Sequence, residues 1–139
     1  MSLDIVYFSN KSENTHRFVK KLGIENNFRI PLDATRKCPY VYTKPYVLFV
    51  PTYGAGNDGH SIPWQVKEFL YVRSNRDLLR GIVGFGNTNF GTTYCKAADL
   101  ISAKTGVPVL AKIELLGMPE DVELVKTRMR ELNEQLQLP

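Results

Sequence analysis

The chain alternates short apolar runs with amphipathic segments along its whole length, and this alternation restricts the folds it can adopt. The run Tyr46–Val50 is uninterrupted and rich in β-branched and aromatic residues, which is typical of a strand buried on both faces of a parallel sheet. The segment 15–22 has its apolar residues spaced as the stripe of a helix, and Gly23 is expected to end that helix. The same reasoning predicts strands at 3–8, 28–30, 46–50, 81–85 and 107–116, and helices over 15–22, from Pro63, over 94–101 and from Pro119.

Five strands that alternate with helices in 139 residues predict an α/β fold in a single domain spanning 1–139. We expect a doubly wound sandwich, with a five-stranded parallel sheet and helices on both faces. The flavodoxin-like strand order 2-1-3-4-5 is the natural choice at this size. Hydrophobic residues make up 43% of the chain, enough for a core without metal or disulfide support.

Charge and cysteine content exclude several classes of function. The net charge is +4, but the basic residues are scattered rather than clustered as in nucleic-acid-binding surfaces, so we expect no nucleic-acid partner. The two cysteines form neither a CxxC pair nor a disulfide framework, and no metal site is expected. The chain begins without a signal-peptide pattern and has no run of membrane-spanning length, which predicts a cytoplasmic protein that is not bound to a membrane.

The loop that follows the first predicted strand is suited to binding phosphate. It places hydroxyl and amide side chains immediately before a helix, whose N-terminus offers unpaired N–H groups and positive potential. Ser12 or Asn14 acting simply as a helix cap is the alternative. The candidate phosphate ligands are Ser9, Asn10, Ser12, Asn14 and Thr15.

Two further glycine-rich loops follow the third and fourth predicted strands. The first contains Tyr53, Gly54, Gly56 and Gly59, and the second spans 86–91. Glycines allow the backbone to approach a flat ligand closely, although ordinary turns have the same composition. Because the carboxyl ends of parallel strands share one edge, the three loops together predict a nucleotide-sized site.

Two side chains near these loops are ambiguous. Cys95 follows Tyr94 at a predicted helix start, where the thiol pKa could fall, and a buried, inert cysteine is the alternative. His16 has no obvious Asp or Cys partner in the sequence and is expected to be a surface residue.

Several motifs resemble the NrdI family of flavoproteins, and the resemblance covers nearly the whole chain. The motifs are Val6–Ser9, Ser12–Thr15, Val50–Gly54, Arg80–Gly81, Gly86–Gly91 and Glu114–Gly117, of which Gly86-Asn87-Thr88-Asn89-Phe90-Gly91 is the most specific. The resemblance implies a flavodoxin-like fold that carries FMN. It places the FMN phosphate on the first loop and the flavin between the other two. The residues it assigns to the flavin are Thr52, Tyr53, Gly54, Ala55, Gly56, Asn87, Thr88, Asn89, Phe90, Gly91, Tyr94 and Cys95.

The resemblance also implies a function. In this family the reduced flavin reacts with oxygen and supplies superoxide, or a related oxidant, to the dimanganese small subunit of class Ib ribonucleotide reductase, which then generates a tyrosyl radical. The protein would thus be a redox activator rather than a stand-alone metabolic enzyme, and it would need a separate flavin-reducing partner. Ala55 interrupts a glycine run found in other members, so loop movements linked to flavin redox state are expected to differ.

Other functions fit the same fold. A generic electron-transfer flavodoxin without oxygen chemistry would share the FMN site. A signalling receiver domain needs an acidic pair where this chain has Ser9-Asn10, and a cysteine-loop phosphatase needs a cysteine that the first loop lacks. A flavin-free interaction module would be colourless and would ignore added FMN.

Overall fold

The order of helices and strands follows the alternation of the sequence. A computed structural model describes residues 3–32, 40–53, 61–87 and 94–137, and the structural statements below refer to these residues. In chain order the elements are β1 (Asp4–Tyr7), α1 (Asn14–Leu22), β2 (Asn27–Arg29), β3 (Tyr46–Pro51), α2 (Trp64–Tyr71), α3 (Arg73–Asp77), β4 (Leu79–Gly86), α4 (Lys96–Thr105), β5 (Val109–Glu114) and α5 (Pro119–Gln137).

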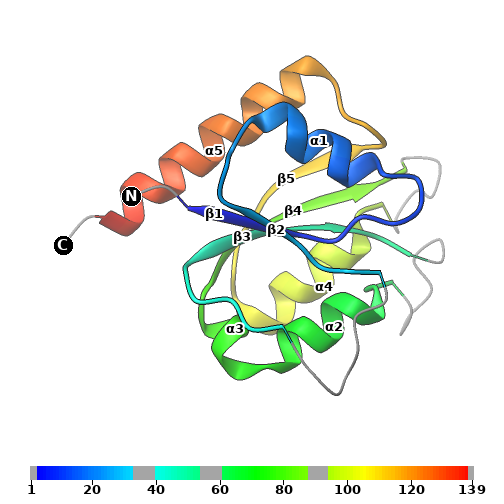
Figure 1. Cartoon of the computed structure of the whole chain (residues 1–139). Coiled ribbons are helices and arrows are strands. Elements are labelled where there is room, and N and C mark those ends of the chain that lie inside the picture. Colours follow the sequence, from blue (N-terminus) through cyan, green and yellow to red (C-terminus); the bar gives the residue numbers. More distant parts are fainter. Residues whose placement is uncertain (1–2, 33–39, 54–60, 88–93, 138–139) are drawn as a thin grey trace.

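The strands form one five-stranded parallel sheet in the order β2-β1-β3-β4-β5, which confirms the predicted topology. β3 lies at the centre, with Ile5 of β1 opposite Val47. On the other side of β3, Phe49 lies opposite Val83 of β4. The strand arrows point toward the edge at which the loop between β1 and α1 also lies (Figure 1). The loops that follow β1, β3, β4 and β5 therefore meet at this carboxyl edge.

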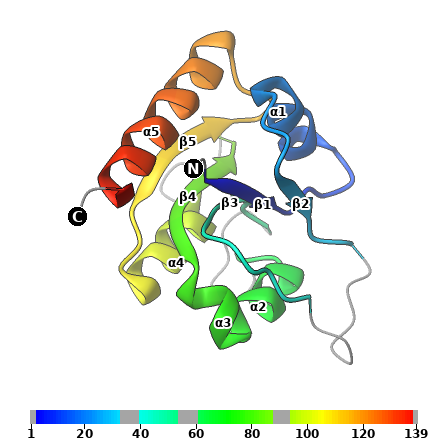
Figure 2. The same cartoon turned by 60° about the vertical axis from the view of Figure 1, so that its left-hand side comes forward.

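Helices cover both faces of the sheet, as Figure 2 shows, with α1 and α5 on one face and α2, α3 and α4 on the other. Successive side chains of each strand alternate between two cores. Tyr7 and Phe49 pack in the core beneath α1 and α5. Val6 and Leu48 pack in the core beneath α2 and α4. Every residue of β3 is buried, as its uninterrupted apolar run predicted.

Helix α1 forms as its spacing predicted. Its buried residues are Thr15, Phe18, Val19 and Leu22. Gly23 ends the helix with a φ of 70°, a left-handed conformation that glycine adopts without steric cost. The helix positions the first loop directly over the carboxyl edge of β1.

Other boundaries differ from the predictions by small amounts. Pro63 precedes α2 as its N-cap rather than opening the helix. Strand β5 ends at Glu114, so Leu115 and Leu116 lie in a turn instead of in the strand. The short helix α3 was not predicted. Its Asn75 is fully buried and binds three backbone groups with its side chain: it accepts from the N–H of Tyr42 and donates to the carbonyls of Tyr40 and Phe69.

None of the helices among the described residues is long and apolar enough to cross a lipid bilayer.

Candidate functional site

A cavity of about 130 Å³ lies at the carboxyl edge of the sheet, where four loops meet. The loops follow β1, β3, β4 and β5. None of the described residues that line the cavity is charged. They are Asn10, Ser12, Asn14, Thr15, Pro51, Thr52, Phe85, Gly86, Asn87 and Leu115. The structure thus brings together six of the residues that the sequence assigned to the site: Asn10, Ser12, Asn14, Thr15, Thr52 and Asn87.

The first loop is ordered by its own polar side chains. Oδ1 of Asn10 accepts hydrogen bonds from the backbone N–H and the hydroxyl of Ser12, and the N–H bond is 3.0 Å long. Ser9 is fully buried below the cavity, and its Oγ accepts a 3.1 Å bond from the N–H of His16 in the first turn of α1. Ser9 therefore caps the helix from seven residues away, while Asn10 and Ser12 remain at the cavity wall.

Glu13 closes this loop in an unusual backbone conformation. It is the N-cap of α1 and has a φ of 65°. Residues other than glycine and asparagine rarely adopt this left-handed backbone conformation. Arg29, at the end of β2, donates from both terminal nitrogens to the Glu13 carboxylate, with a distance of 3.1 Å from Nη1 to Oε2. These hydrogen bonds lower the pKa of Glu13 and raise that of Arg29. Glu13 thus carries no uncompensated negative charge beside the cavity.

The loop after β3 is tied to α4 through Thr52. Its Oγ1 accepts a 3.0 Å hydrogen bond from the N–H of Ala97, an N–H in the first turn of a helix whose own N-cap residue supplies no side-chain bond. Gly84 permits the close approach of α4 to β4, because a Cβ there would lie 2.7 Å from the Cβ of Ala98. Gly86 does the same beside the site, where a Cβ would lie 2.9 Å from the backbone nitrogen of Cys95.

Leu115 is a site residue that sequence reasoning missed. It lies in the turn after β5 with a φ of 53°, its side chain is half-exposed at the cavity, and its N–H donates to the carbonyl of Gly86 at 2.9 Å. The motif Glu114–Gly117 was noted, but the strand was predicted to continue through Leu116, which would have placed Leu115 in the sheet.

Of the other predicted residues, those that the structure describes lie near the cavity but are not among its lining residues. Tyr53 is half-buried, and its ring packs edge-on against Phe8 with centroids 6.0 Å apart. Tyr94 is half-buried beside Cys95. Cys95 is fully buried with a φ of 55°, and burial raises its pKa to about 11. This favours the inert thiol over the reactive one. Gly54, Ala55, Gly56, Thr88, Asn89, Phe90 and Gly91 lie outside the described residues.

His16, expected at the surface without an Asp or Cys partner, is half-buried and has a tyrosine partner that the sequence analysis did not identify. Its Nδ1 is hydrogen-bonded to the hydroxyl of Tyr7 at 2.6 Å, and the two rings stack with centroids 5.8 Å apart. Burial raises the pKa of Tyr7, so this hydroxyl keeps its proton at neutral pH. The pair braces the first turn of α1 against β1.

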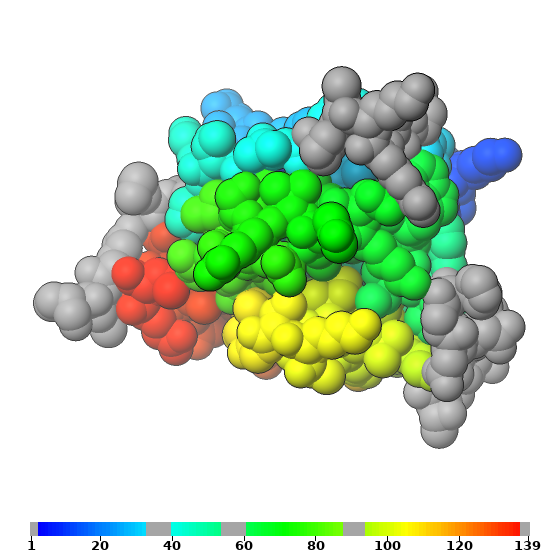
Figure 3. All heavy atoms as spheres, turned by 90° about the horizontal axis from the view of Figure 1, so that it is seen from below, coloured from blue at the N-terminus to red at the C-terminus, as the bar shows by residue number. Residues whose placement is uncertain are grey.

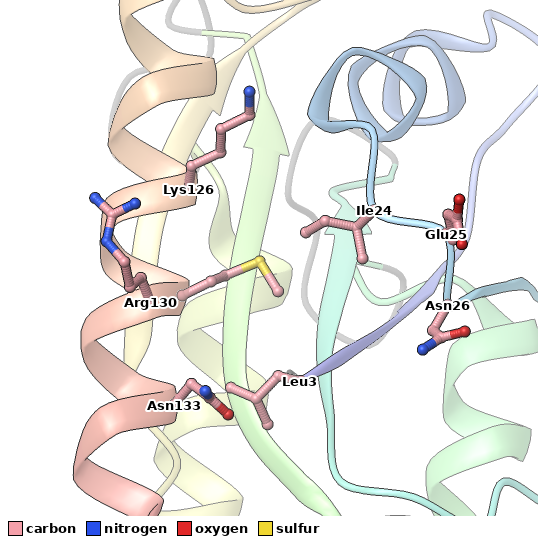
Figure 4. A pocket seen from close by; sticks show the side chains of 8 residues that line it. Leu3, Ile24, Glu25, Asn26, Lys126, Arg130 and Asn133 are labelled. Carbon is pink, nitrogen blue, oxygen red and sulfur yellow. The ribbon is translucent and has the colours of Figure 1, made fainter. Parts of the chain in front are cut away.

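Two larger cavities lie away from this edge. One, of about 420 Å³, is found at the amino end of the sheet between α5 and the segment before β2 (Figure 4). Its charged lining residues are Glu25, Lys126 and Arg130, and its apolar ones are Leu3, Ile24 and Met129. The other, of about 320 Å³, lies between α2–α3 and α4, which run side by side in Figure 3. Neither adjoins the start of a helix and the ends of several strands, the combination by which open α/β folds bind ligands.

The donor set of the small cavity fits a phosphate. Hydroxyls and amides of the first loop stand at the N-terminus of α1, where helix potential is positive, and the nearby carboxylate of Glu13 is neutralised by Arg29. Within the described residues, no group of three or more His, Cys, Asp or Glu residues is arranged to hold a metal ion. The chemistry is that of an anion site beside apolar walls supplied by Phe85 and Leu115.

Comparisons with known proteins agree with this geometry. The family model described as NrdI Flavodoxin like matches residues 6–127. A Protein NrdI from Agrobacterium fabrum is 50% identical over 122 residues, covering 88% of this chain and 91% of the relative. A Protein NrdI from Brucella ovis is 48% identical over 131 residues, covering 94% of each chain.

Solved structures support the fold alone, because their sequences are distant. A Streptococcus pneumoniae TIGR4 flavodoxin superposes with a TM-score of 0.58 at 22% identity, covering 97% of this chain and 99% of the other. Oxidised Flavodoxin 1 from Bacillus cereus gives a TM-score of 0.55 at 17% identity, covering both chains completely.

Proposed function

Because the chain belongs to the NrdI flavodoxin-like family, we propose that it binds one FMN and acts as a redox protein for ribonucleotide reductase. The observation that carries the proposal is the cavity at the carboxyl edge, whose described lining is uncharged and places hydroxyl and amide groups around the start of α1. In this assignment the phosphate lies against Asn10, Ser12, Asn14 and Thr15. Thr52, Asn87 and the remaining residues assigned to the site by resemblance would hold the flavin.

Each part of the cavity has a distinct task in this proposal. The first loop binds the phosphate dianion through neutral donors and the helix N-terminus. Phe85 and Leu115 supply apolar surface. Thr52 fixes the distance between the loop after β3 and α4 through its bond to Ala97.

The charge of the described loops should disfavour a reduced, anionic flavin less than an acidic site would. In the described part of the first loop, Lys11 is exposed and Glu13 is paired with Arg29. A site surrounded by unpaired carboxylates would disfavour a flavin anion, and the described loops lack such a set. Flavin supplies one- and two-electron redox chemistry when bound.

The finer proposal concerns the electron acceptor and the partner. The reduced protein would pass electrons to oxygen, and the superoxide formed would reach the dimanganese small subunit of class Ib ribonucleotide reductase. A separate reductase would supply the electrons. The basic net charge of +4 favours encounter with an acidic partner and makes the association salt-sensitive.

A radical assay tests the finer proposal. The reduced protein, oxygen and the manganese-loaded small subunit from the same organism are mixed, and the tyrosyl radical is measured by electron paramagnetic resonance. The proposal expects a radical signal that depends on this protein. If the flavin is reduced and reoxidised normally but the radical signal stays at the level seen without this protein, the generic electron-carrier function is favoured instead.

A further inference from the structure

The first loop is held from outside by a single arginine. Arg29 lies at the end of β2, directly opposite Tyr7 in the sheet register, and reaches across the end of β1. Its two terminal nitrogens bond both carboxylate oxygens of Glu13, and Nη2 also donates to the carbonyl of Ser9 at 3.4 Å. One guanidinium therefore connects both ends of the segment 9–13, whose middle residues form the cavity wall.

The backbone hydrogen bonds of this segment depend on the conformation of Glu13. Its N–H donates to the carbonyl of Asn10 at 3.0 Å, which closes the turn that presents Asn10 and Ser12 to the cavity. Its own carbonyl accepts from the N–H of Arg17 at 2.9 Å and so begins α1. A left-handed φ at a glutamate is disfavoured, so the fork of hydrogen bonds from Arg29 stabilises a conformation that the residue would otherwise leave.

The same contact also controls charge. Glu13 is flanked in sequence by Ser12 and Asn14, both of which line the cavity. An unpaired carboxylate at this position would repel a phosphate dianion, whereas the paired carboxylate does not. Bidentate arginine–carboxylate pairs are the surface ion pairs whose geometry contributes most.

We propose that Arg29 and Glu13 are positioning residues for the phosphate, and that their ion pair sets how strongly the protein prefers FMN to riboflavin. This inference rests on the proposed function. It goes beyond it, because neither residue lines the cavity and neither was among the residues assigned to FMN by sequence or by resemblance.

The test compares FMN and riboflavin, which differ only by the phosphate, by fluorescence titration of the apoprotein. Arg29→Gln leaves the Glu13 carboxylate unpaired and is expected to weaken FMN binding about tenfold, with riboflavin binding changed less than about twofold. Arg29→Gln with Glu13→Gln removes the repulsive charge as well and is expected to recover part of that loss. Arg73→Gln breaks an exposed pair with Asp77 on α3 and serves as the matched control, with both affinities unchanged.

The outcomes separate the two proposals. Unchanged FMN affinity in Arg29→Gln, or equal losses for FMN and riboflavin, would overturn the positioning role while leaving FMN binding intact. A wild-type protein that binds neither flavin would overturn the proposed function itself. Circular dichroism reports folding. If Arg29→Gln does not fold, Arg29→Lys keeps the positive charge but cannot make the two parallel hydrogen bonds, and so tests the positioning role alone. A reduced FMN-to-riboflavin affinity ratio would support that role, and a ratio equal to that of wild type would overturn it.

Discussion

The hydroxyl of Thr52, at the end of β3, accepts a hydrogen bond from the backbone N–H of Ala97 in α4, 45 residues further along the chain. The start of the loop after β3 and the first turn of α4 are thus joined by one side chain. A residue assigned to the cofactor from its position is at the same time a long-range helix cap.

Replacing this cap is expected to destabilise the apoprotein. Thr52→Val keeps the shape and removes the acceptor, which should lower the free energy of unfolding by about 1 kcal/mol, the usual cost of losing a cap. Urea denaturation of the flavin-free protein measures the change. Thr52→Ser keeps the hydroxyl and should retain most of the stability. Equal stability of wild type and Thr52→Val would show that the bond contributes nothing.

Replacement by glycine should affect the free energy of unfolding differently at Leu115 and at its neighbour Leu116. The φ of 53° at Leu115 is unfavourable for leucine and free for glycine, so Leu115→Gly should leave the free energy of unfolding within about 1 kcal/mol of wild type or raise it. FMN affinity should fall, because the apolar side chain at the cavity is lost. Leu116→Gly, at a position without a positive φ, should lower stability. Denaturation and FMN titration of both variants check this contrast, and identical behaviour would contradict it.

Gly84 should tolerate no larger residue while Ala98 faces it. The Cβ introduced by Gly84→Ala would lie 2.7 Å from that of Ala98, so one of the two backbones must move, at a cost of about 1–3 kcal/mol. Adding Ala98→Gly removes the clash. The double variant should therefore be more stable than the sum of the two single losses in free energy of unfolding predicts, even though glycine itself destabilises helix α4. Thermal and urea unfolding of the single and double variants measure the coupling. Strictly additive losses would mean that the two positions do not compete for space.

The Glu13–Arg29 pair predicts a specific pH dependence of stability. Hydrogen bonding to Arg29 lowers the pKa of Glu13 below its ordinary value of 4.5, so the folded state favours the carboxylate. The stabilisation is therefore complete above pH 4.5 and is lost as the pH falls through the lowered pKa of the folded state. Wild type should be more stable than Glu13→Gln at pH 7, and the gap should narrow progressively below pH 4.5. A gap that stays constant between pH 7 and pH 3 would contradict the ion-pair assignment.

Local patterns in the sequence predicted most of the fold. The helical stripe that ends at Leu22, the stop at Gly23 and the buried run Tyr46–Val50 each depend on neighbouring residues, and all three are confirmed. The strand order 2-1-3-4-5 was predicted from five strands that alternate with helices in a chain of 139 residues. The end of β5 was misplaced because Leu115 and Leu116 are apolar and give no turn signal, although the chain turns there.

The site was predictable only in part, because some of its contacts join distant segments. The positions of Asn10, Thr52 and Asn87 after their strands predicted that they share one edge of the sheet, and all three line the cavity there. Arg29 pairs with Glu13, which lies 16 positions earlier, and no local sequence pattern predicts this contact. The same holds for the hydrogen bond between His16 and Tyr7, a partner that the sequence analysis did not identify.

The most direct test of the central claim is the flavin content of the protein. The purified protein is saturated with FMN, freed of excess ligand and denatured, and the released flavin is identified and quantified against protein concentration. The account predicts one FMN per chain, with the visible spectrum of the bound flavin lost on denaturation, and weaker retention after Ser12→Ala with Thr15→Ala. A colourless protein whose spectrum and thermal stability are unchanged by added FMN would contradict it.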